Sequence, residues 1–217
     1  MIKDILVDLL EPLRLLIFKF RWRNRNRHNF TKAMNRFPIN RVEIGNATYG
    51  GFEIHHFQNP NSKLIIKSFC SIADGTKFLL GGEHKYNCFS TYPFKRRLLL
   101  EKLEAETKGN IIINDDVWIG NGVTLLSGVE VGQGCIIGAG SIVTKSLPPY
   151  SIYAGGKIRK FRFSSKVIEL LLEIDFEKIN KENVAENLDS VYLDDINLFL
   201  ESNFYKQILK QDHCEST

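Results

Sequence analysis

Hydrophobic side chains recur every six residues between residues 113 and 153. When the chain is divided into hexapeptides from Ile113, six of the seven first positions are aliphatic, and the fifth positions hold mostly small or medium side chains. The first positions are Ile113, Ile119, Leu125, Val131, Ile137, Val143 and Pro149, and the fifth positions are Val117, Val123, Val129, Cys135, Ser141, Leu147 and Tyr153. A short fixed period of this kind predicts a solenoid in which each repeat covers the next.

Each hexapeptide is expected to form one flat side of a prism, with the first and fifth side chains pointing inward. Stacked coils would then pair along the axis at the strand spacing of about 4.8 Å, which satisfies the backbone groups of every coil. Gly120, Gly132 and Gly138 occupy second positions, where we expect backbone angles that a β-carbon would penalise. These features predict an all-β core built as a parallel β-helix.

The same period continues upstream in a less regular form. It is visible as IGNATY from Ile44 and as IKSFCS, IADGTK and FLLGGE from Ile66. Two stretches interrupt it, at residues 50–64 and 85–112. We therefore place the β-helix domain at residues 41–160 and expect residues 84–112 to form a loop extruded from it.

The N-terminal segment, residues 1–40, predicts an amphipathic helix followed by a basic stretch. Charged residues interrupt its apolar run, so it is too polar to span a bilayer, which needs about 20 mostly apolar residues. The helix either caps the solenoid or packs on a neighbouring subunit. Alternatively, basic residues alternating with aromatic ones suit peripheral contact with anionic lipid through residues 1–27. The apolar residues that would share one helical stripe are Ile2, Leu6, Leu9, Leu13, Leu16 and Phe20.

Residues 161–217 predict a helical C-terminal region. Ser165 is of a residue type that caps helices, and a helix would run from it to Leu172. The remaining residues are acidic and indicate one or two further helices. A basic strip precedes this region, formed by Lys157, Arg159, Lys160 and Arg162.

Composition is that of a globular protein, with 43% hydrophobic and 25% charged residues. The net charge of +4 conceals an asymmetry, because residues 166–217 hold five Lys and no Arg against twelve Asp or Glu. The basic remainder suits an anionic ligand, such as cofactor phosphates, a membrane surface or an acidic glycan; no nucleic-acid-binding motif is present. The four cysteines lack C-x-x-C spacing and follow no secretory signal, so we expect reduced thiols in a cytoplasmic protein.

The long loop opens with Gly81-Gly82-Glu83-His84 and continues through FSTYPF at residues 89–94. Together with DVWIGNGVTLLSGVEVGQGCIIGAGSIVTKSLPPYSIYAGG, these motifs resemble the hexapeptide-repeat acetyltransferases of the xenobiotic type, which modify chloramphenicol and streptogramins. They are similar also to the relatives that O-acetylate capsule and lipopolysaccharide sugars. The resemblance covers residues 64–175 and implies a left-handed β-helix, a homotrimer and active sites between neighbouring subunits.

The resemblance implies that His84 is the general base. Acyl transfer from a thioester to a hydroxyl needs a base that titrates near neutral pH, and histidine side chains ordinarily titrate at about pH 6.5. The imidazole would take the proton of the acceptor and return it to the departing sulfur. Trp118 corresponds to a tryptophan near the thioester, where its indole N–H could donate a hydrogen bond; packing between subunits is the alternative.

Acetyl-CoA is the implied co-substrate, and no metal is implied. Coenzyme A would lie along the solenoid, with its 3′-phosphate on the basic strip. Tyr92 and Phe94 are expected to shape the cleft for a carbohydrate or another hydroxyl-bearing acceptor. The cofactor-binding residues implied by the resemblance are Asn121, Ala139, Thr144, Lys145, Arg159 and Lys160.

Three further features are assigned no role. Cys88 lies four residues from His84 and could act as a nucleophile, but transfer within a ternary complex needs no acyl-enzyme. His55 and His56 would point to opposite faces of a strand and could not both bind one metal. The aspartates at residues 115–116 occupy positions of the repeat where outward polar residues are expected.

The predicted function is acetyl transfer from acetyl-CoA to a sugar hydroxyl of a surface polysaccharide, capsule or lipopolysaccharide, or of its precursor. The expected location is the cytoplasm, at the inner face of the membrane if the N-terminal helix binds lipid. An antibiotic hydroxyl and the amino group of a nucleotide-linked sugar are alternative acceptors. A non-catalytic solenoid, used as a scaffold or binding module, is a further alternative, since the repeat alone would permit it.

Overall fold

The computed structural model describes residues 2–57, 61–100 and 106–210, without the side chains of residues 2–9. The chain divides into two compact units, Met1–Phe161 and Arg162–Thr217. All the strands from β1 to β13 belong to the first unit, and the second unit is helical.

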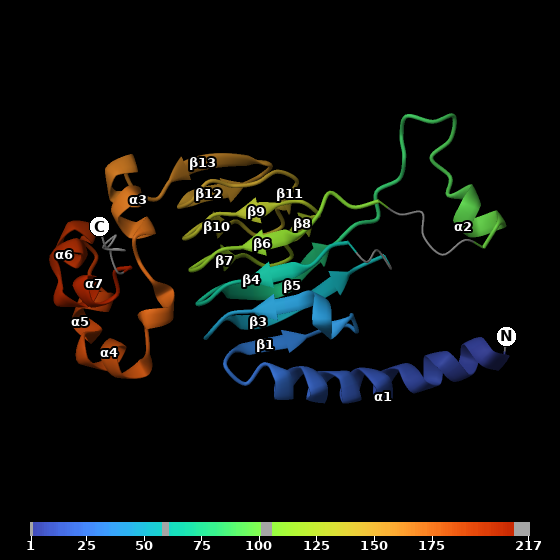
Figure 1. Ribbon diagram of the computed structural model, residues 1–217, viewed down its shortest axis with the longest axis horizontal. Helices are drawn as coiled ribbons and strands as arrows, with labels where there is room; N and C mark the ends of the chain where they lie inside the picture. Colours follow the sequence, from blue (N-terminus) through green and yellow to red (C-terminus); the bar gives the residue numbers. More distant parts are fainter. Residues whose placement is uncertain (1, 58–60, 101–105, 211–217) are drawn as a thin grey trace, which may run out of the picture. The chain divides into compact units, whose positions relative to one another are not determined.

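The strands of the first unit stack in three rows of parallel pairs (Figure 1). The first row consists of β2 (Val42–Ile44), β4 (Leu64–Ile66), β6 (Ile111–Ile113) and β9 (Glu130–Val131). The second row consists of β1 (Phe30–Ala33), the first parts of β3 (Tyr49–His55) and β5 (Ser71–Leu79), then β7 (Trp118–Ile119), β10 (Ile136–Ile137) and β12 (Ser151–Ala154). The third row consists of the later parts of β3 and β5, then β8 (Thr124–Leu126) and β11 (Ile142–Val143).

The register of these rows follows from the period of the sequence. Val131 pairs with Ile113 in the first row, and Ile137 pairs with Ile119 in the second. Partners are thus three hexapeptides apart, so each coil contributes one hexapeptide to each side of the prism. The predicted parallel β-helix is confirmed.

The inward positions are those that the repeat predicts. All the aliphatic first positions from Ile113 to Val143 are buried, and so are all the fifth positions from Val117 to Tyr153. Burial of one aliphatic side chain stabilises a fold by roughly 1.5–3 kcal/mol. The core therefore runs along the axis as a column of side chains from successive coils.

The glycines at second positions have a different role from the predicted one. Positive φ angles occur at fourth positions, for example 67° at Gly122, and not at second positions such as Gly120 and Gly132. A β-carbon on Gly120 would lie 2.6 Å from the backbone nitrogen of Ala139, and one on Gly132 would lie 2.4 Å from that of Pro149. Glycine is needed there because the backbone of the next coil passes too close for a β-carbon.

Helix α1 (Ile2–Arg25) closes one end of the stack with Phe18 and Trp22. Their rings contact Phe37 with centroid distances of 5.0 and 5.2 Å, and Trp22 also meets Phe52 at 6.0 Å. Edge-to-face contacts of this kind favour a single orientation of the rings. The helix therefore caps the solenoid, which was one of its predicted roles.

The apolar stripe marked by the sequence does not make this contact. Leu13, Leu16 and Phe20 are 54%, 64% and 69% exposed. The prediction of a helix is confirmed, whereas its packing face is formed by other residues. No helix in the described ranges combines the length and the apolar character that crossing a membrane requires.

The interruptions of the repeat also differ from the prediction. The first one starts later, because residues 49–55 form β3 and pair with β1 and β5. The second begins after β5, contains α2 (Phe94–Leu98) and extends away from the stacked strands (Figure 1). A 3-10 helix at Ile39–Arg41 leads into β2, and β13 (Lys157–Phe161) folds back antiparallel to β12.

The second unit begins with α3 (Ser165–Leu172), whose N-cap is Ser164, one residue before the predicted cap. The helices that follow are shorter and more numerous than predicted. They are the 3-10 helix Phe176–Lys178, α4 (Lys181–Glu186), α5 (Leu188–Val191), α6 (Ile196–Glu201) and α7 (Asn203–Gln207). Leu171, Ile174, Phe204, Tyr205 and Ile208 are buried within this unit.

Candidate active site

His84 lies at the start of the extruded loop, directly after a pair of glycines. Gly81 and Gly82 have φ angles of 150° and 98°, which residues with a side chain rarely adopt. Beyond them, the outgoing and returning chains form an antiparallel bridge between Glu83 and Glu106. The Glu106 N–H donates to the Glu83 carbonyl over 2.9 Å, and the Gly82 N–H donates to the Glu106 carbonyl over 3.1 Å. The loop therefore leaves the β-helix through a closed neck.

The side chain of Glu83 fastens this neck to the β-helix. Its Oε1 accepts a hydrogen bond from Ser127 Oγ over 2.6 Å. The same hydroxyl oxygen accepts from the backbone N–H of Lys108 over 3.1 Å. The other carboxylate oxygen, Oε2, is buried and has no hydrogen-bond partner in the part of the chain that the structure describes. The residue preceding His84 is thus tied to the turn that follows β8.

The imidazole of His84 is oriented by the loop itself. Its Nδ1 lies 2.7 Å from the carbonyl oxygen of Thr91. Because a carbonyl oxygen can only accept, Nδ1 carries the hydrogen. The neutral ring then presents an unprotonated Nε2, which is the form that a general base requires. The side chain is exposed, so an acceptor can approach it.

Aromatic rings gather on the loop beside the segment that orients His84. Tyr92 and Phe94 meet edge to face with centroids 5.0 Å apart, and Phe94 stacks with Phe89 at 5.8 Å. All three are exposed. Helix α2 follows at once and contributes the exposed cations Lys95 and Arg97. The two residues predicted to shape the acceptor cleft therefore lie together, next to positive charge.

Trp118 lies on a different side of the prism from the loop. It belongs to β7 in the second row, and its side chain is 56% exposed. The loop instead follows the part of β5 that belongs to the third row. Along the second row, Trp118 pairs with Ser71 and Ser71 with Tyr49. Within one chain, His84 and Trp118 belong to different sides.

The residues expected along the solenoid occupy both edges of the third row. Asn121 and Ala139 lie on successive coils at the corner between the second and third rows, where the Gly140 N–H donates to the Asn121 carbonyl over 2.8 Å. Thr144 and Lys145 follow β11, at the other edge, and are exposed. The structure therefore groups Asn121 with Ala139 and separates both from Thr144 and Lys145.

The residues expected to meet the 3′-phosphate lie on β13. All the side chains of this strand are exposed. Arg159 folds back over the turn, where its Nε donates to the Ala154 carbonyl over 2.8 Å. Lys160 pairs with Ile152 of β12. The strand thus presents a basic edge beyond the last coil.

The repeat has counterparts in known proteins. The family pattern described as bacterial transferase hexapeptide (six repeats) matches residues 110–145. A Lysinibacillus sphaericus protein named "Probable macrolide acetyltransferase" is 42% identical over 146 residues, which are 62% of this chain and 80% of that protein. The chain belongs to the hexapeptide-repeat acetyltransferases. It is an acetyltransferase, and the predicted left-handed β-helix is the fold of its family.

Other relatives of this acetyltransferase bear the names of antibiotic-modifying enzymes. The "Chloramphenicol acetyltransferase" of Klebsiella aerogenes is 38% identical over 131 residues, 56% of this chain and 62% of that protein. The "Virginiamycin A acetyltransferase" of Staphylococcus aureus is 39% identical over 153 residues, 67% of this chain and 70% of that protein. Among solved structures, the polySia specific acetyltransferase NeuO is 26% identical, with a TM-score of 0.43 over 64% of this chain and 61% of that chain.

Two groups that the sequence analysis assigned no role have structural partners. The Cys88 thiol contacts the carbonyl oxygens of Lys85 and Ser90, at 3.5 and 3.3 Å. Asp115 Oδ1 accepts from the backbone N–H of Ser68 over 2.8 Å and so joins two coils. Within the described ranges, no group of three or more His, Cys, Asp or Glu side chains could hold a metal ion.

Three residues that hold or orient the candidate site escaped the sequence analysis. Thr91 acts through its backbone carbonyl, which no residue type reveals. Ser127 occupies a third position of the repeat, where any polar side chain fits. Glu83 belongs to the quoted motif, but only the structure shows that its side chain turns toward Ser127. Sequence spacing therefore located the loop but not the contacts that hold it.

Proposed function

We propose that this protein is an acetyl-CoA-dependent O-acetyltransferase in which His84 is the general base. The observation that carries the proposal is the 2.7 Å contact between His84 Nδ1 and the Thr91 carbonyl. It leaves Nε2 free to accept a proton at the mouth of the loop. The family and the loop motif support the same reaction.

Acetyl-CoA supplies the acetyl group as a thioester. His84 Nε2 takes the proton of the acceptor hydroxyl while the acceptor oxygen attacks the acetyl carbon. The bond between that carbon and sulfur then breaks, and the proton on Nε2 passes to the sulfur of the leaving thiol. The proton is thereby conserved and His84 returns to its neutral form.

The other site residues predicted from the sequence are proposed to bind coenzyme A. Trp118 would donate its indole N–H near the thioester. The successive corners that carry Asn121 and Ala139 suit an arm laid along the axis, because each coil advances by about 4.8 Å. Thr144 and Lys145 are assigned to the same path, and the exposed Arg159 and Lys160 of β13 are assigned to the 3′-phosphate, since guanidinium and ammonium groups both pair with phosphate.

We also propose a cytoplasmic homotrimer whose sites lie between subunits. His84 and Trp118 belong to different sides of one chain, so a site that uses both would be completed by a neighbour. The outward side chains Phe30, Tyr49 and Trp118 of the second row are exposed, and burial between subunits would remove this apolar surface from water. Co-expressed His84→Ala and Trp118→Ala chains should then recover activity that neither variant has alone. An activity of the co-expressed chains no greater than the summed activities of the two variants alone would contradict the shared site.

The proposed acceptor is a sugar hydroxyl of a surface polysaccharide, or of its precursor, that carries acidic groups. The exposed rings of Tyr92 and Phe94 offer flat apolar faces to a sugar ring, and Lys95 and Arg97 lie next to them. Cations on the loop would attract an anionic glycan and hold it near His84. The combination of rings and cations is the reason for placing an acidic carbohydrate first.

An antibiotic hydroxyl is the second candidate acceptor. The observation that favours it is that relatives are named for macrolides, chloramphenicol and virginiamycin, with identities of 42%, 38% and 39% in the three described above. Their reaction would use the same base and the same acetyl donor. The two candidates differ in what the aromatic and basic loop recognises.

An acceptor screen separates these possibilities. The 217-residue chain is incubated with acetyl-CoA and an acidic oligosaccharide, a neutral oligosaccharide, a macrolide, chloramphenicol, a streptogramin or a nucleotide-linked amino sugar. Thiol release gives the rate, and mass spectrometry locates the acetyl group. Highest kcat/KM on the acidic oligosaccharide, with an ester product, is expected. Preference for an antibiotic would overturn the sugar assignment, and an amide product would overturn O-acetylation.

The role of His84 is tested with a matched pair of variants. His84→Ala should lower kcat/KM by about 10²–10⁴, the usual contribution of a positioned general base. His55→Ala is the control, because the His55 imidazole lies on β3 and contacts Glu53 at 3.3 Å. Full activity in His84→Ala would refute the proposed base.

A further inference from the structure

Helix α1 has two opposite faces, and only one of them contacts the β-helix. Phe18 and Trp22 are buried against the first coil, and α1 lies along the end of the stack, beside β1 (Figure 1). Successive residues are about 100° apart around an α-helix, so Leu13, Leu16 and Phe20 point to nearly the opposite side. All three are more than half exposed. The helix therefore covers the core with one face and presents a second apolar face outward.

Basic side chains border this second face. By the same helical geometry, Arg21 lies along one border and Lys19 along the other, whereas Arg25 lies close to the side of Phe18. All three basic residues are exposed. We call the apolar residues between these borders the outward face of α1; they are Leu10, Leu13, Leu16, Ile17 and Phe20.

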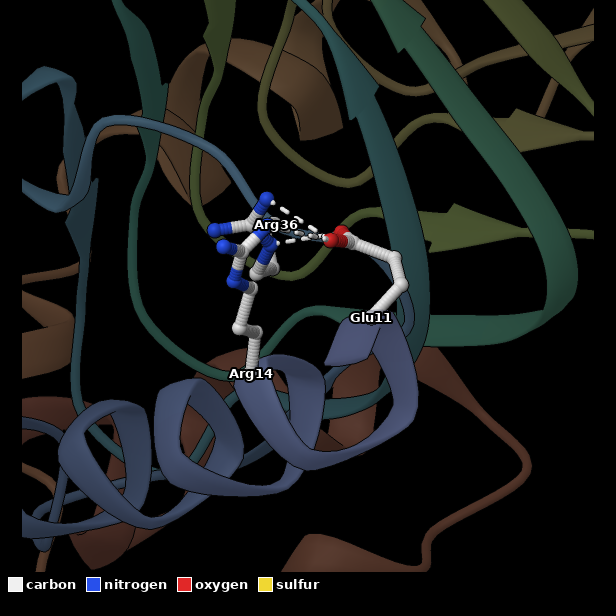
Figure 2. Close-up of polar contacts among 3 residues, drawn as sticks. All are labelled: Glu11, Arg14 and Arg36. Carbon is white, nitrogen blue, oxygen red and sulfur yellow. Dashed lines mark hydrogen bonds and ion pairs between the residues drawn. The ribbon is translucent and has the colours of Figure 1, made fainter. Parts of the chain in front are cut away.

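The carboxylate in this part of α1 points toward the body of the protein. Among residues 10–25, Glu11 is the sole acidic residue, and it lies on the side of Phe18 and Trp22. Its oxygens accept from the Arg36 guanidinium over 2.8 and 3.1 Å, and Arg14 approaches it at 3.8 Å (Figure 2). Charge is thus segregated around the helix, with the described acid inward and cations beside the outward face.

We propose that the outward face of α1 binds the surface of an anionic phospholipid bilayer. The helix would lie in the plane of the interface, with the side chains of Leu13, Leu16 and Phe20 at the boundary of the acyl chains. Lys19 and Arg21 would then meet the lipid phosphates. A helix lying in this plane needs neither the length nor the uniform apolarity of a membrane-spanning helix.

Charge distinguishes this partner from a second copy of the chain. A two-fold contact through the outward face would bring the same surface of both copies together, and with it the cations Lys19 and Arg21 of each. No carboxylate among residues 10–25 lies on that face to compensate them. An anionic bilayer supplies both the apolar layer and the negative charge. The proposal is independent of which acceptor receives the acetyl group.

Sedimentation with sucrose-loaded vesicles tests the charge component. The protein should sediment with mixed phosphatidylcholine and phosphatidylglycerol vesicles, much less with phosphatidylcholine alone, and should be released by high salt. Replacing Lys19 and Arg21 by Gln should weaken binding about 25-fold, at roughly fivefold for each basic residue near the surface. The control with the same change of net charge in the second unit, expected to bind normally, is Lys166→Gln and Lys206→Gln.

The apolar component is tested with a second pair of variants. Replacing Leu13, Leu16 and Phe20 by Ser should abolish sedimentation while leaving acetyl transfer to a soluble acceptor unchanged, because Phe18 and Trp22 still cap the core. The control changes side chains of similar exposure (52%, 77% and 52%) in the second unit. Those control changes are Leu188→Ser, Tyr192→Ser and Leu198→Ser.

Three outcomes would overturn the proposal. The first is that wild-type protein sediments with neither kind of vesicle, and the second is that binding persists unchanged in both variants of α1. The third is that the wild type binds no vesicles and the Ser variant of the outward face has a lower oligomeric mass than the wild type by light scattering. That result would assign the face to a second copy of the chain. If the wild-type protein transfers acetyl to none of the acceptors, the proposed function is refuted, but the proposed membrane contact is unaffected.

Discussion

The neck of the loop that carries His84 can be loosened by removing one hydroxyl group. Ser127→Ala deletes the donor that lies 2.6 Å from Glu83 Oε1. Glu83 Oε2 already has no hydrogen-bond partner among the described residues, so the variant leaves neither carboxylate oxygen bonded. Loss of a hydrogen bond to a charged group, here a half-buried carboxylate, costs about 1.5–3 kcal/mol. Two backbone hydrogen bonds between the loop ends would remain to hold the neck.

This cost should appear in catalysis more than in global stability, because it falls on the residue next to His84. If the loosened neck relaxes in the resting enzyme, its free-energy cost must be supplied when His84 is positioned for the reaction. A cost of about 1.5–3 kcal/mol then corresponds to a loss of roughly 10- to 150-fold in kcat/KM. A misplacement of about 1 Å has a similar effect of around 100-fold. Steady-state kinetics with acetyl-CoA and the best acceptor measure the loss, and thermal unfolding monitors the fold.

Ser68→Ala provides a matched control. Ser68 is also buried, and its Oγ accepts from the Asn46 N–H over 3.0 Å without touching the loop, so activity should be retained. A double-mutant cycle with Glu83→Ala then isolates the contact. The double variant should be no slower than the slower single variant. Fully additive losses, or normal kinetics in Ser127→Ala, would refute the positioning role.

Three further predictions concern cysteines and glycines. Cys88→Ser should keep its kcat within about twofold, since a general-base mechanism uses no acyl-enzyme; a loss comparable to that of His84→Ala would restore the nucleophile hypothesis. Gly132→Ala should lower the melting temperature more than Gly138→Ala, because its β-carbon would lie 2.4 Å from a backbone nitrogen whereas that of Gly138 would lie 3.0 Å from a methyl group; the reverse order would contradict the close-approach explanation. Burial raises the pKa of Cys70 from 9.0 to about 12, so the thiol loses its proton at a lower pH in the unfolded chain than in the folded one. The free energy of unfolding should therefore be unaffected by this thiol below pH 9 and should fall between pH 9 and 12 by up to about 1.4 kcal/mol per pH unit. Urea unfolding of Cys70→Ala should show a correspondingly weaker pH dependence, and an identical slope would rule out this contribution.

The predictions from sequence were accurate where a regular period carried the information. A first position such as Val131 must be apolar in every coil because it faces the same axis, so burial could be read from spacing alone. The extent of the upstream coils was harder to predict. Residues 49–55 carry the polar Glu53 and His55 on the outside, and they pair with β5 through a shift in register that hides the six-residue period.

The apolar stripe of α1 shows a second limit. Amphipathicity identifies side chains that avoid water, and Leu13 and Phe20 meet that criterion, but it does not name their partner. In the folded chain, Phe18 and Trp22 fill the end of the solenoid because their rings fit against Phe37. The apolar stripe that the sequence marks therefore faces outward, where a surface other than the described residues can contact it.

By itself the sequence determined the parallel β-helix, its inward positions and the place of the loop that carries His84, because these depend on local period and motif. The tertiary structure decided which nitrogen of His84 is free, through the carbonyl of Thr91, and how the neck is held, through Ser127. It also decided why glycine is needed at second positions: the backbone of the next coil lies too close for a β-carbon, whereas the φ angles there are not positive. These features arise from contacts between residues far apart or from backbone atoms, and neither leaves a pattern in residue type.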